Sequence, residues 1–228
     1  MLPTEAEHRI RAILEDLENV RENLLAVSDD IWLSIDHNDN DAMQEGVRFK
    51  QEYNEKMDAF ARVAEELSVL VQQFTNIRTT TADRDDTPAQ GASRERAIAE
   101  LDRRTPHAIA EDFTYKRPYG YKLGDHAAIE LTTWRALYEH LLLHLRDFSP
   151  DTFGSLPDSP ETVSRRGSPH FSRDPQALRV ASELADGIHT EINLSANSIR
   201  DMIRTVLPLF GYAESDLSIY LREDRDAQ

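Results

Sequence analysis

The chain has 228 residues, with 42 acidic and 26 basic side chains and a formal net charge of −16. An acidic surface repels nucleic-acid phosphates at long range, which excludes non-specific binding over the whole surface but still allows a local basic patch. The absence of cysteine excludes disulfides, thiol nucleophiles and cysteine-ligated zinc. No apolar run reaches the roughly 18 residues that span a bilayer, and the N-terminus is not signal-like, so we expect a cytoplasmic protein with no membrane contact.

Residues 1–78 are predicted to form a long, coiled-coil-like helical hairpin. Apolar residues recur at alternating spacings of three and four, which is typical of a helix packed lengthwise on another. Charged residues such as Glu18, Arg21 and Glu22 cover the other faces of the first helix. The seam residues are Ile10, Ile13, Leu17, Val20, Leu24, Val27 and Ile31, followed by Met43, Val47, Met57, Phe60, Ala64, Leu67, Val71 and Phe74.

The segment SIDHNDNDAMQE, residues 34–45, joins the two helical patterns. Acidic and amide residues alternate from Asp36, as the first ligands of a calcium loop would. A calcium loop beginning there needs glycine at its sixth position and glutamate at its twelfth, and these positions hold Asp41 and Val47. We therefore expect no metal here, and predict a turn in which Asp41 and Gln44 cap the second helix.

Residues 79–105 are predicted to be a linker. The first half is small, polar and charged and contains Pro88 and Gly91, which disfavour regular structure. The second half predicts a short helix from Ser93 to Arg103, with Ile98 as one of its few apolar anchors.

Residues 106–228 are predicted to form a small mixed α/β domain, which makes the whole chain α+β. The β-prone segment FTYKRPYGYKL, a turn at Gly124-Asp125 and the segment AAIEL predict a hairpin. Thr132 or Thr133 then caps a helix. The buried face of this helix is predicted to hold Trp134, Leu137, Tyr138, Leu141, Leu145 and Phe148.

A proline-rich loop of about thirty residues, 149–175, is expected after this helix, and loops of that length are usually functional or mobile. The segment GIHTEINL then predicts a strand, Ala196 to Phe210 a helix ending at Gly211, and Asp216 to Leu221 a last strand. The second half thus reads ββα and then βαβ, and ligands of parallel βαβ sheets gather at the carboxyl ends of strands.

The strongest candidate binding segment is VSRRGSPHFSRDPQALR, residues 163–179. Its arginines offer planar forks of donors suited to phosphate or carboxylate, and a histidine adds a further donor. We weigh an anion or nucleic-acid site against pairing of these arginines with the protein's own carboxylates. The candidate residues are Arg165, Arg166, His170, Arg173 and Arg179.

Two further segments could contact phosphate. Ser195 begins a helix directly after a strand, with Asn197 beside it, and helix N-termini attract anions. Lys116 and Arg117 lie among tyrosines on the predicted hairpin, where basic and aromatic side chains suit single-stranded nucleic acid. The alternatives are ordinary N-capping for the first segment and core or rim packing for the second.

Signals for catalysis, metals and cofactors are weak. His140 and His144 are spaced as a zinc pair but lack a third ligand in register, so structural histidines are preferred. The chain contains no Walker loop, dinucleotide-binding glycine fingerprint or GxSxG elbow. Glu191 could be a nuclease carboxylate, but the lysine that such a motif needs is replaced by Asn193. We therefore expect no metal or cofactor and favour a non-enzymatic role, with a hydrolase or nuclease as the weakest alternative.

Several motifs resemble, in order, an uncharacterised bacterial domain. They are FTYKRPYGYKL, Thr133-Trp134 followed by Leu137, FSRDPQALR, EINLSANSIRDMI and FGYAESDLSIYLRE, and together they cover residues 113–223. Members of that family carry varied N-terminal regions and tend to lie near restriction–modification, other defence or mobile-element genes. The resemblance implies a bacterial defence setting but no reaction and no catalytic residues.

The sequence thus leaves two main hypotheses. In the first, the chain is a binding or adaptor protein that associates through its N-terminal helices and recognises an anion, a nucleic acid or a protein through its C-terminal half. In the second, it is an acidic structural or regulatory protein whose charge imitates that of DNA, and it binds a basic partner protein without binding nucleic acid. Because a hairpin alone cannot cover its apolar seam, we expect the seam to dock on the C-terminal domain or on a second copy, and favour a dimer.

Overall fold

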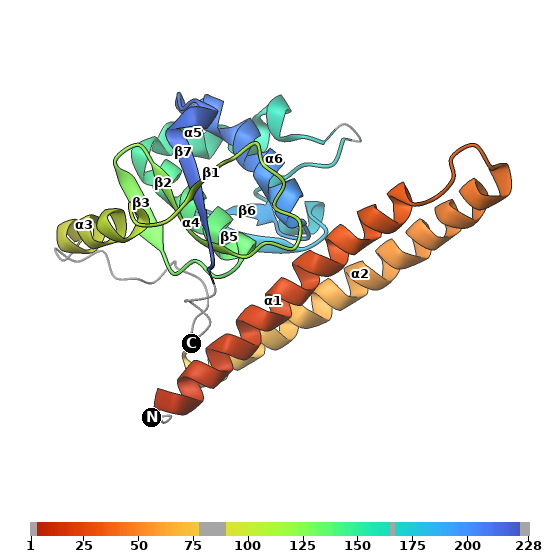
Figure 1. Ribbon diagram of the computed structural model, residues 1–228, viewed down its shortest axis with the longest axis horizontal. Coiled ribbons are helices and arrows are strands. Elements are labelled where there is room, and N and C mark those ends of the chain that lie inside the picture. Colours follow the sequence, from red (N-terminus) through yellow and green to blue (C-terminus); the bar gives the residue numbers. More distant parts are fainter. Residues whose placement is uncertain (1–3, 78–89, 165–166, 224–228) are drawn as a thin grey trace.

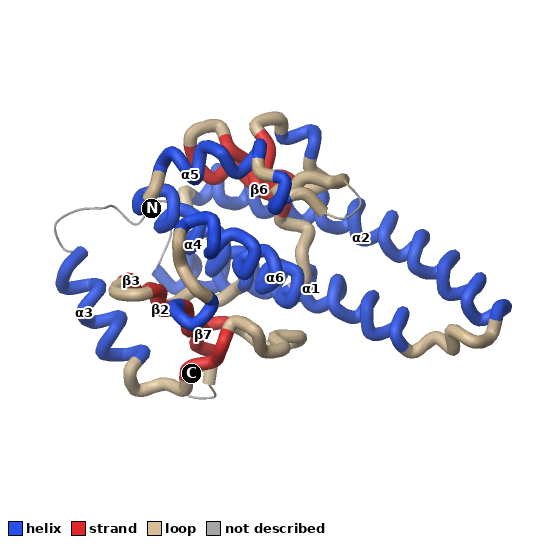
Figure 2. Tube along the Cα trace, turned by 90° about the horizontal axis from the view of Figure 1, so that it is seen from above, coloured by secondary structure: helices blue, strands red, loops and turns tan. Residues whose placement is uncertain are grey.

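The computed structural model describes residues 4–77, 90–164 and 167–223 and confirms the α+β class. Two long antiparallel helices, α1 (Thr4–Leu33) and α2 (Asn40–Thr75), form the hairpin. Residues 90–223, called here the C-terminal region, form two small sheets with helices around them. Figure 1 and Figure 2 show one end of the hairpin lying against the C-terminal region and the other end, with the turn, projecting beyond it.

The hairpin turn is stabilised by contacts of Asp39, Gly46 and Lys50. Asp39, rather than the predicted Asp41, caps α2, because its carboxylate accepts the backbone N–H of Asp41 at 2.8 Å. A Cβ atom at Gly46 would lie 2.2 Å from the side chain of Ile35, so glycine allows the turn to pack on α2. Lys50 donates to Ser28 Oγ at 2.6 Å, which joins the two helices one turn further along.

The first sheet has the strand order β1-β7-β2-β3 and is antiparallel throughout. The predicted β-hairpin is present, and its turn is set by Gly124, whose φ of +54° favours glycine. Helix α3 (Gln90–Leu101) packs on this sheet through Ala97 and Leu101, so the helix predicted inside the linker is part of the core. Residues 79–89 of the predicted linker lie outside the described residues. The strands are β1 (Pro106–Ala108), β2 (Pro118–Leu123), β3 (His126–Ile129) and β7 (Leu217–Leu221).

The second sheet, with the order β4-β6-β5, is also antiparallel. The predicted order strand, helix, strand is present as β6, α6 and β7, but β6 and β7 belong to different sheets. The chain therefore forms no parallel βαβ pair here, and the rule that places ligands at parallel strand ends does not apply. The elements are β4 (Phe171–Ser172), β5 (Ala181–Ala185), β6 (Ile188–Glu191) and α6 (Ala196–Val206).

Helix α4 (Trp134–Phe148) is the centre of the core and packs against β2, β5 and α6. Thr133 caps it, and its predicted apolar face is buried except for Phe148, which is 57% exposed. The predicted loop 149–175 is largely ordered instead. It contains α5 (Pro150–Ser155) and short 3₁₀ turns, because Phe153, Leu156 and Phe171 anchor it in the core.

Gly120 in β2 offers a direct test of the sheet packing. A Cβ atom there would lie 2.2 Å from the carbonyl oxygen of Ala128 on β3, so Gly120→Ala must push two paired strands apart. We expect a loss of about 2 kcal/mol or more in the free energy of unfolding, measured by urea denaturation. Gly154→Ala, where nothing lies within 4 Å of the new methyl group, is the matched control and should be neutral or stabilising. Equal stability of the two variants would contradict this packing.

Candidate interaction site on the hairpin

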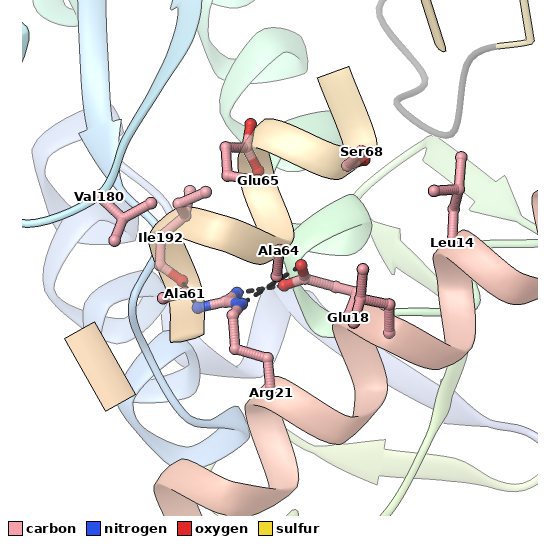
Figure 3. Close-up of a pocket in the computed structure, with 10 residues that line it drawn as sticks. Leu14, Glu18, Arg21, Ala61, Ala64, Glu65, Ser68, Val180 and Ile192 are labelled. Carbon is pink, nitrogen blue, oxygen red and sulfur yellow. Dashed lines mark hydrogen bonds and ion pairs between the residues drawn. The ribbon is translucent and has the colours of Figure 1, made fainter. Parts of the chain in front are cut away.

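The face of α1 that meets the C-terminal region carries buried polar and charged side chains beside apolar ones such as Leu14. Its buried residues include Arg21 and Glu22, which were predicted to lie on outer faces of the helix. The Arg21 guanidinium is 2% exposed, pairs with Glu18 one turn earlier, and donates to the carbonyl oxygen of Ile192. Figure 3 shows this side chain reaching from α1 toward Ile192, past Ala61 of α2. A cation thus ties α1 to the segment that follows β6.

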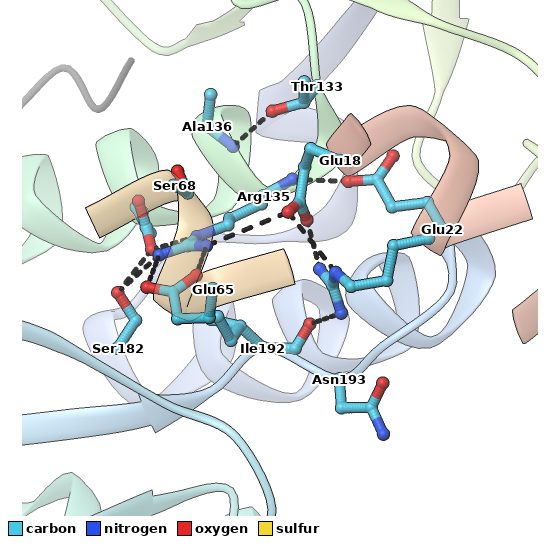
Figure 4. A network of polar contacts seen from close by, with 12 residues as sticks. Glu18, Glu22, Glu65, Ser68, Thr133, Arg135, Ala136, Ser182, Ile192 and Asn193 are labelled. Carbon is cyan, nitrogen blue, oxygen red and sulfur yellow. Dashed lines mark hydrogen bonds and ion pairs between the residues drawn. The ribbon is translucent and has the colours of Figure 1, made fainter. Parts of the chain in front are cut away.

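A second guanidinium, that of Arg135 in α4, lies at the centre of a network shared by four elements (Figure 4). It binds Glu65 of α2 through both terminal nitrogens, at 2.5 and 3.2 Å. It also binds Glu139 at 2.9 Å and Ser182 Oγ of β5 at 3.3 Å, and lies 3.8 Å from Glu18. Because the side chain of Arg135 is only 13% exposed, these interactions are weakly screened by solvent.

Glu22 of α1 caps the first turn of α4 from outside that helix. Its carboxyl oxygens accept the backbone N–H groups of Trp134 at 3.4 Å and Arg135 at 2.9 Å. Thr133 Oγ1 accepts the next N–H group, that of Ala136, at 3.0 Å. The three N–H groups at the start of α4 therefore all have acceptors, two of them supplied by the hairpin.

The pKa values of two buried carboxyl groups at this junction are shifted in opposite directions. Burial raises the pKa of Glu22 to about 8, with a further rise from the nearby carboxylate of Glu18, so Glu22 is mostly protonated at neutral pH. Burial also acts on Glu18, but the charges of Arg21 and Arg135 outweigh it and lower the pKa of Glu18. The pKa of Arg135 is raised well above its ordinary value, since Glu139, Glu18 and Glu65 together outweigh the effect of burial. The junction therefore holds the Arg135 guanidinium charged and the carboxyl group of Glu22 mostly neutral at neutral pH.

The gap between the hairpin and the C-terminal region is nearly filled. A cavity of about 10 Å³ remains beside Arg21 and Glu18, lined also by Ala61, Val180 and Ile192 (Figure 3). This volume corresponds to about one water molecule, so the junction is a packed interface and has no room for an organic ligand.

Further contacts along the hairpin fix its direction. Asn193 donates to Asp58 of α2 at 2.9 Å, and Tyr115 OH donates to Asp30 of α1 at 2.6 Å. Arg117, one of the predicted phosphate ligands, lies 3.5 Å from Asp16 of α1 at an exposed position. Contacts at several levels of α1 and α2 therefore hold the hairpin against the C-terminal region.

Only part of the predicted apolar seam lies outside this junction: Leu67 and Phe74 are exposed, together with Val63 and Leu70, which were not predicted, whereas Met57 and Ala64 are buried. Val63, Leu67, Leu70 and Phe74 follow one face of α2 at helical spacing and are 52%, 49%, 62% and 91% exposed. On α1, the seam positions Ile13, Val20 and Ile31 are also exposed. We call these seven residues the outer face: Ile13, Val20, Ile31, Val63, Leu67, Leu70 and Phe74.

The outer face points away from the C-terminal region on both helices. At about 100° per residue, Ile13 and Val20 lie about 160–180° round α1 from Glu22, which contacts α4. By the same reckoning, Leu67 lies about 180° round α2 from Asp58, which contacts Asn193. The predicted seam is therefore divided between two sides of the hairpin. Leu17 and Ala64 lie at the junction, where Ala61 also packs against Val180 and Ile192, whereas the outer face points away from it.

The candidate binding segment 163–179, called here the basic loop, is only partly described by the structure. Arg165 and Arg166 lie outside the described residues. Arg173 binds Asp158 at 2.9 Å and the carbonyl oxygen of Gly154 at 2.6 Å, so its donors are used within the protein. Arg179 is exposed before β5, and burial lowers the pKa of His170.

The other predicted phosphate ligands also have intramolecular roles. Ser195 caps α6, as predicted, by accepting the N–H of Ser198. Asn197 accepts the N–H of Phe113 and donates to Asp112 and Thr114, so the start of α6 is tied to the loop before β2. Lys116 Nζ lies 5.8 Å from the ring centroid of Phe113, and the Lys116 carbonyl accepts the Trp134 indole N–H. Whether any of these residues binds phosphate stays a prediction.

The structure adds a third histidine to the pair on α4. The rings of His126 and His144 are stacked at 3.6 Å between centroids, and His140 lies 5.7 Å from His126. Stacked rings turn their faces, rather than their nitrogen lone pairs, toward each other. Accordingly, no group of three potential ligands within residues 4–77, 90–164 and 167–223 is arranged to hold a metal ion.

Reasoning from the sequence missed the junction. The available signal was Arg135, which with Glu139 forms a charged pair four residues apart amid the apolar positions of α4. Charged residues in such surroundings are rarely buried unless they are paired, which predicts a buried partner. The contributions of Glu22 and Glu65 could not be predicted, because they arise from the packing of distant segments.

Comparisons with protein-family models, with curated proteins and with solved structures find no match. Among the described residues, no helix is both long and apolar enough to cross a membrane.

Removing the central cation should loosen the hairpin. Arg135→Met removes the cation that Glu18, Glu65 and Glu139 share, and of these Glu18 keeps its ion pair with Arg21. We expect it to lower the free energy of unfolding by about 3–5 kcal/mol in urea denaturation. The control Arg62→Met, at an exposed position of α2, should change it by less than about 0.5 kcal/mol. A near-neutral Arg135→Met would show that the network does not hold the junction.

The raised pKa of Glu22 predicts an unusual pH dependence. The folded protein holds this proton up to about pH 8, whereas an unfolded glutamic acid releases it near its ordinary pKa of 4.5. Its contribution is therefore full below about pH 4.5 and is lost as the pH rises through about 8.

Glu22→Gln, which imitates the protonated form, should remove this dependence. We expect the variant to gain on the order of 3 kcal/mol relative to the wild type between about pH 5 and pH 8, measured by urea denaturation at each pH. Parallel stability curves for the two proteins would mean that Glu22 titrates normally.

Proposed function

We propose that the protein is a non-enzymatic adaptor that binds helices of a protein partner through the outer face of its hairpin. The observation that carries this proposal is the exposure of a continuous apolar stripe on α2, from Val63 to Phe74, beside the exposed seam positions of α1. Apolar stripes with three- and four-residue spacing are the surfaces through which helices pack lengthwise.

The size of the outer face supports a binding role. Its exposed fractions correspond to on the order of 700–800 Å² of surface, whereas the largest apolar patch on a monomeric protein is about 300–600 Å². Burial of apolar surface is the largest favourable contribution to the free energy of protein association. A partner that covers the outer face therefore binds with this hydrophobic contribution.

The junction supports an adaptor rather than a flexible tether. Glu22, Arg21 and Arg135 bind α1 to the C-terminal region by buried, directional contacts. A partner on the outer face is then held at a set orientation relative to the C-terminal region. The two sheets and their loops remain available on the other side of the hairpin for a second recognition event (Figure 2).

The residues considered for hydrolysis have structural environments instead. The carboxylate of Glu191 is buried and accepts the backbone N–H groups of Arg179 at 2.7 Å, Val180 at 3.2 Å and Asn193 at 2.8 Å. These bonds occupy both of its oxygens and hold the segment after β6 in place. Asn193 in turn binds α2, so both residues support the junction.

Recognition of nucleic acid by the basic loop, and a place in a bacterial defence or mobile-element system, stay predictions from the sequence. The internal bonds of Arg173 to Asp158 and Gly154 favour the alternative in which the loop is fixed by the protein's own acceptors. The acidic alternative, a regulator of a basic partner, differs from the present proposal in its salt dependence, because an interface of opposite charges weakens as salt is added.

Photo-crosslinking tests the proposal in cells of the native host. A photoreactive amino acid is placed either at Val63 on the outer face or at Val47, which is also an exposed valine of α2 but lies about 160° away round the helix. We expect a discrete adduct with a polypeptide from position 63 and none from position 47. Equal labelling from both positions, or no adduct from position 63, would overturn the proposed function.

A further inference from the structure

We propose that the partner of the outer face is a second copy of this chain, so that two hairpins pack into a four-helix assembly with two-fold symmetry. This inference rests on the proposed function, because it names the occupant of the same surface. In a two-fold dimer the same patch meets itself, so the face must be able to cover a copy of itself.

The spacing of the outer face meets that requirement. Val63, Leu67, Leu70 and Phe74 are separated by four, three and four residues, and the α1 seam from Ile10 to Ile31 alternates three and four throughout. This repeat keeps apolar side chains on one side of a helix along its length, which allows knobs of one hairpin to enter holes of the other. No charged residue occupies the repeat positions of either stripe, so their packing buries no unpaired charge.

The area also fits a dimer. A stable interface buries about 800 Å² on each partner, and the outer face exposes on the order of 700–800 Å². A small peptide or a single helix would cover one stripe and leave the other exposed. A second hairpin presents the same two stripes, one on α1 and one on α2, and can cover both stripes of the first hairpin at once.

The C-terminal region does not obstruct this arrangement. It contacts α1 through Glu22 and α2 through Asp58, on the sides of the helices opposite the outer face. Two hairpins facing each other therefore carry their C-terminal regions on the outside of the assembly (Figure 1). Both copies keep these regions accessible to other partners.

The charge of the chain favours a second copy over a membrane surface. A helical face that binds anionic lipid is usually flanked by lysine and arginine, and a chain of net charge −16 is repelled by such lipids. Two acidic copies also repel each other, but salt screens this repulsion while leaving the apolar contact intact. The dimer should therefore tighten as salt is added, whereas a complex with a basic partner would weaken.

Sedimentation equilibrium of the full chain tests the inference. We expect twice the 26.1 kDa mass of the chain at micromolar concentration, and a dimer that is stronger at about 0.5 M salt than at about 0.05 M. Val63→Glu and, separately, Leu70→Glu place a charge in the centre of the face and should weaken dimerisation at least tenfold. Val47→Glu is the matched control and should dimerise as the wild type does.

The possible outcomes separate the two proposals. A wild-type monomer at tens of micromolar, or a dimer that is unchanged in both face variants, overturns the second copy as the occupant. In that case a crosslink from position 63 to a different polypeptide still supports the adaptor function. Unchanged unfolding curves for Val63→Glu and Leu70→Glu show that a lost dimer reflects the surface rather than misfolding, because both residues are about half exposed or more. If one variant is destabilised, the other decides.

Discussion

The fold depends on the buried ionic contact between the hairpin and the C-terminal region, centred on Arg135. Its guanidinium joins Glu65 of α2, Glu139 of α4 and Ser182 of β5, while Glu22 of α1 supplies acceptors for the first turn of α4. Buried charges add net stability only when their geometry and hydrogen bonding offset desolvation, but removing one member is costly. The contact therefore chiefly fixes how α1, α2, α4 and β5 are placed relative to one another. A purely apolar interface of the same size would define this placement less uniquely.

The hairpin thus uses its two sides for different purposes. One side, with Arg21 and Glu22 and also Ala61 of α2, makes the intramolecular junction, and another side, with Leu70 and Phe74, remains exposed. An amphipathic helix on a domain usually buries its apolar side and exposes its charged side. Because the exposed apolar side does not stabilise the fold of one chain, it is available for the association proposed above. Fixing the polar side also fixes the direction in which the apolar side points.

Local patterns predicted the elements well where they depend on neighbouring residues. The two long helices, the turn at Gly124 and the cap at Thr133 all follow from helical spacing, capping chemistry or a positive φ. The predicted helix from Ala196 to Phe210 is divided: α6 ends at Val206, and a 3₁₀ turn that contains Pro208 runs from Leu207 to Phe210 before Gly211. The pairing of β7 with both β1 and β2 could not be predicted, because antiparallel partners distant in sequence leave no local signal. Part of the outer face was predicted from the sequence. Ile13, Val20, Ile31, Leu67 and Phe74 were identified as seam residues, whereas Val63 and Leu70 were not. Which side of α1 the C-terminal region covers depends on the contact between Glu22 and α4, which is a tertiary contact.

The central claim is that the junction holds the hairpin in one orientation with its apolar side outward. Because the chain has no cysteine, two can be introduced at exposed sites, Glu55 on the hairpin and Asp151 on α5, and carry spin labels. Pulsed dipolar spectroscopy, with labelled chains diluted in unlabelled ones, then measures the distance between them within one molecule. The structure predicts a single narrow distance distribution that broadens in Arg135→Met. A broad distribution in the otherwise unaltered protein would contradict a rigid junction, and with it the orientation of the outer face.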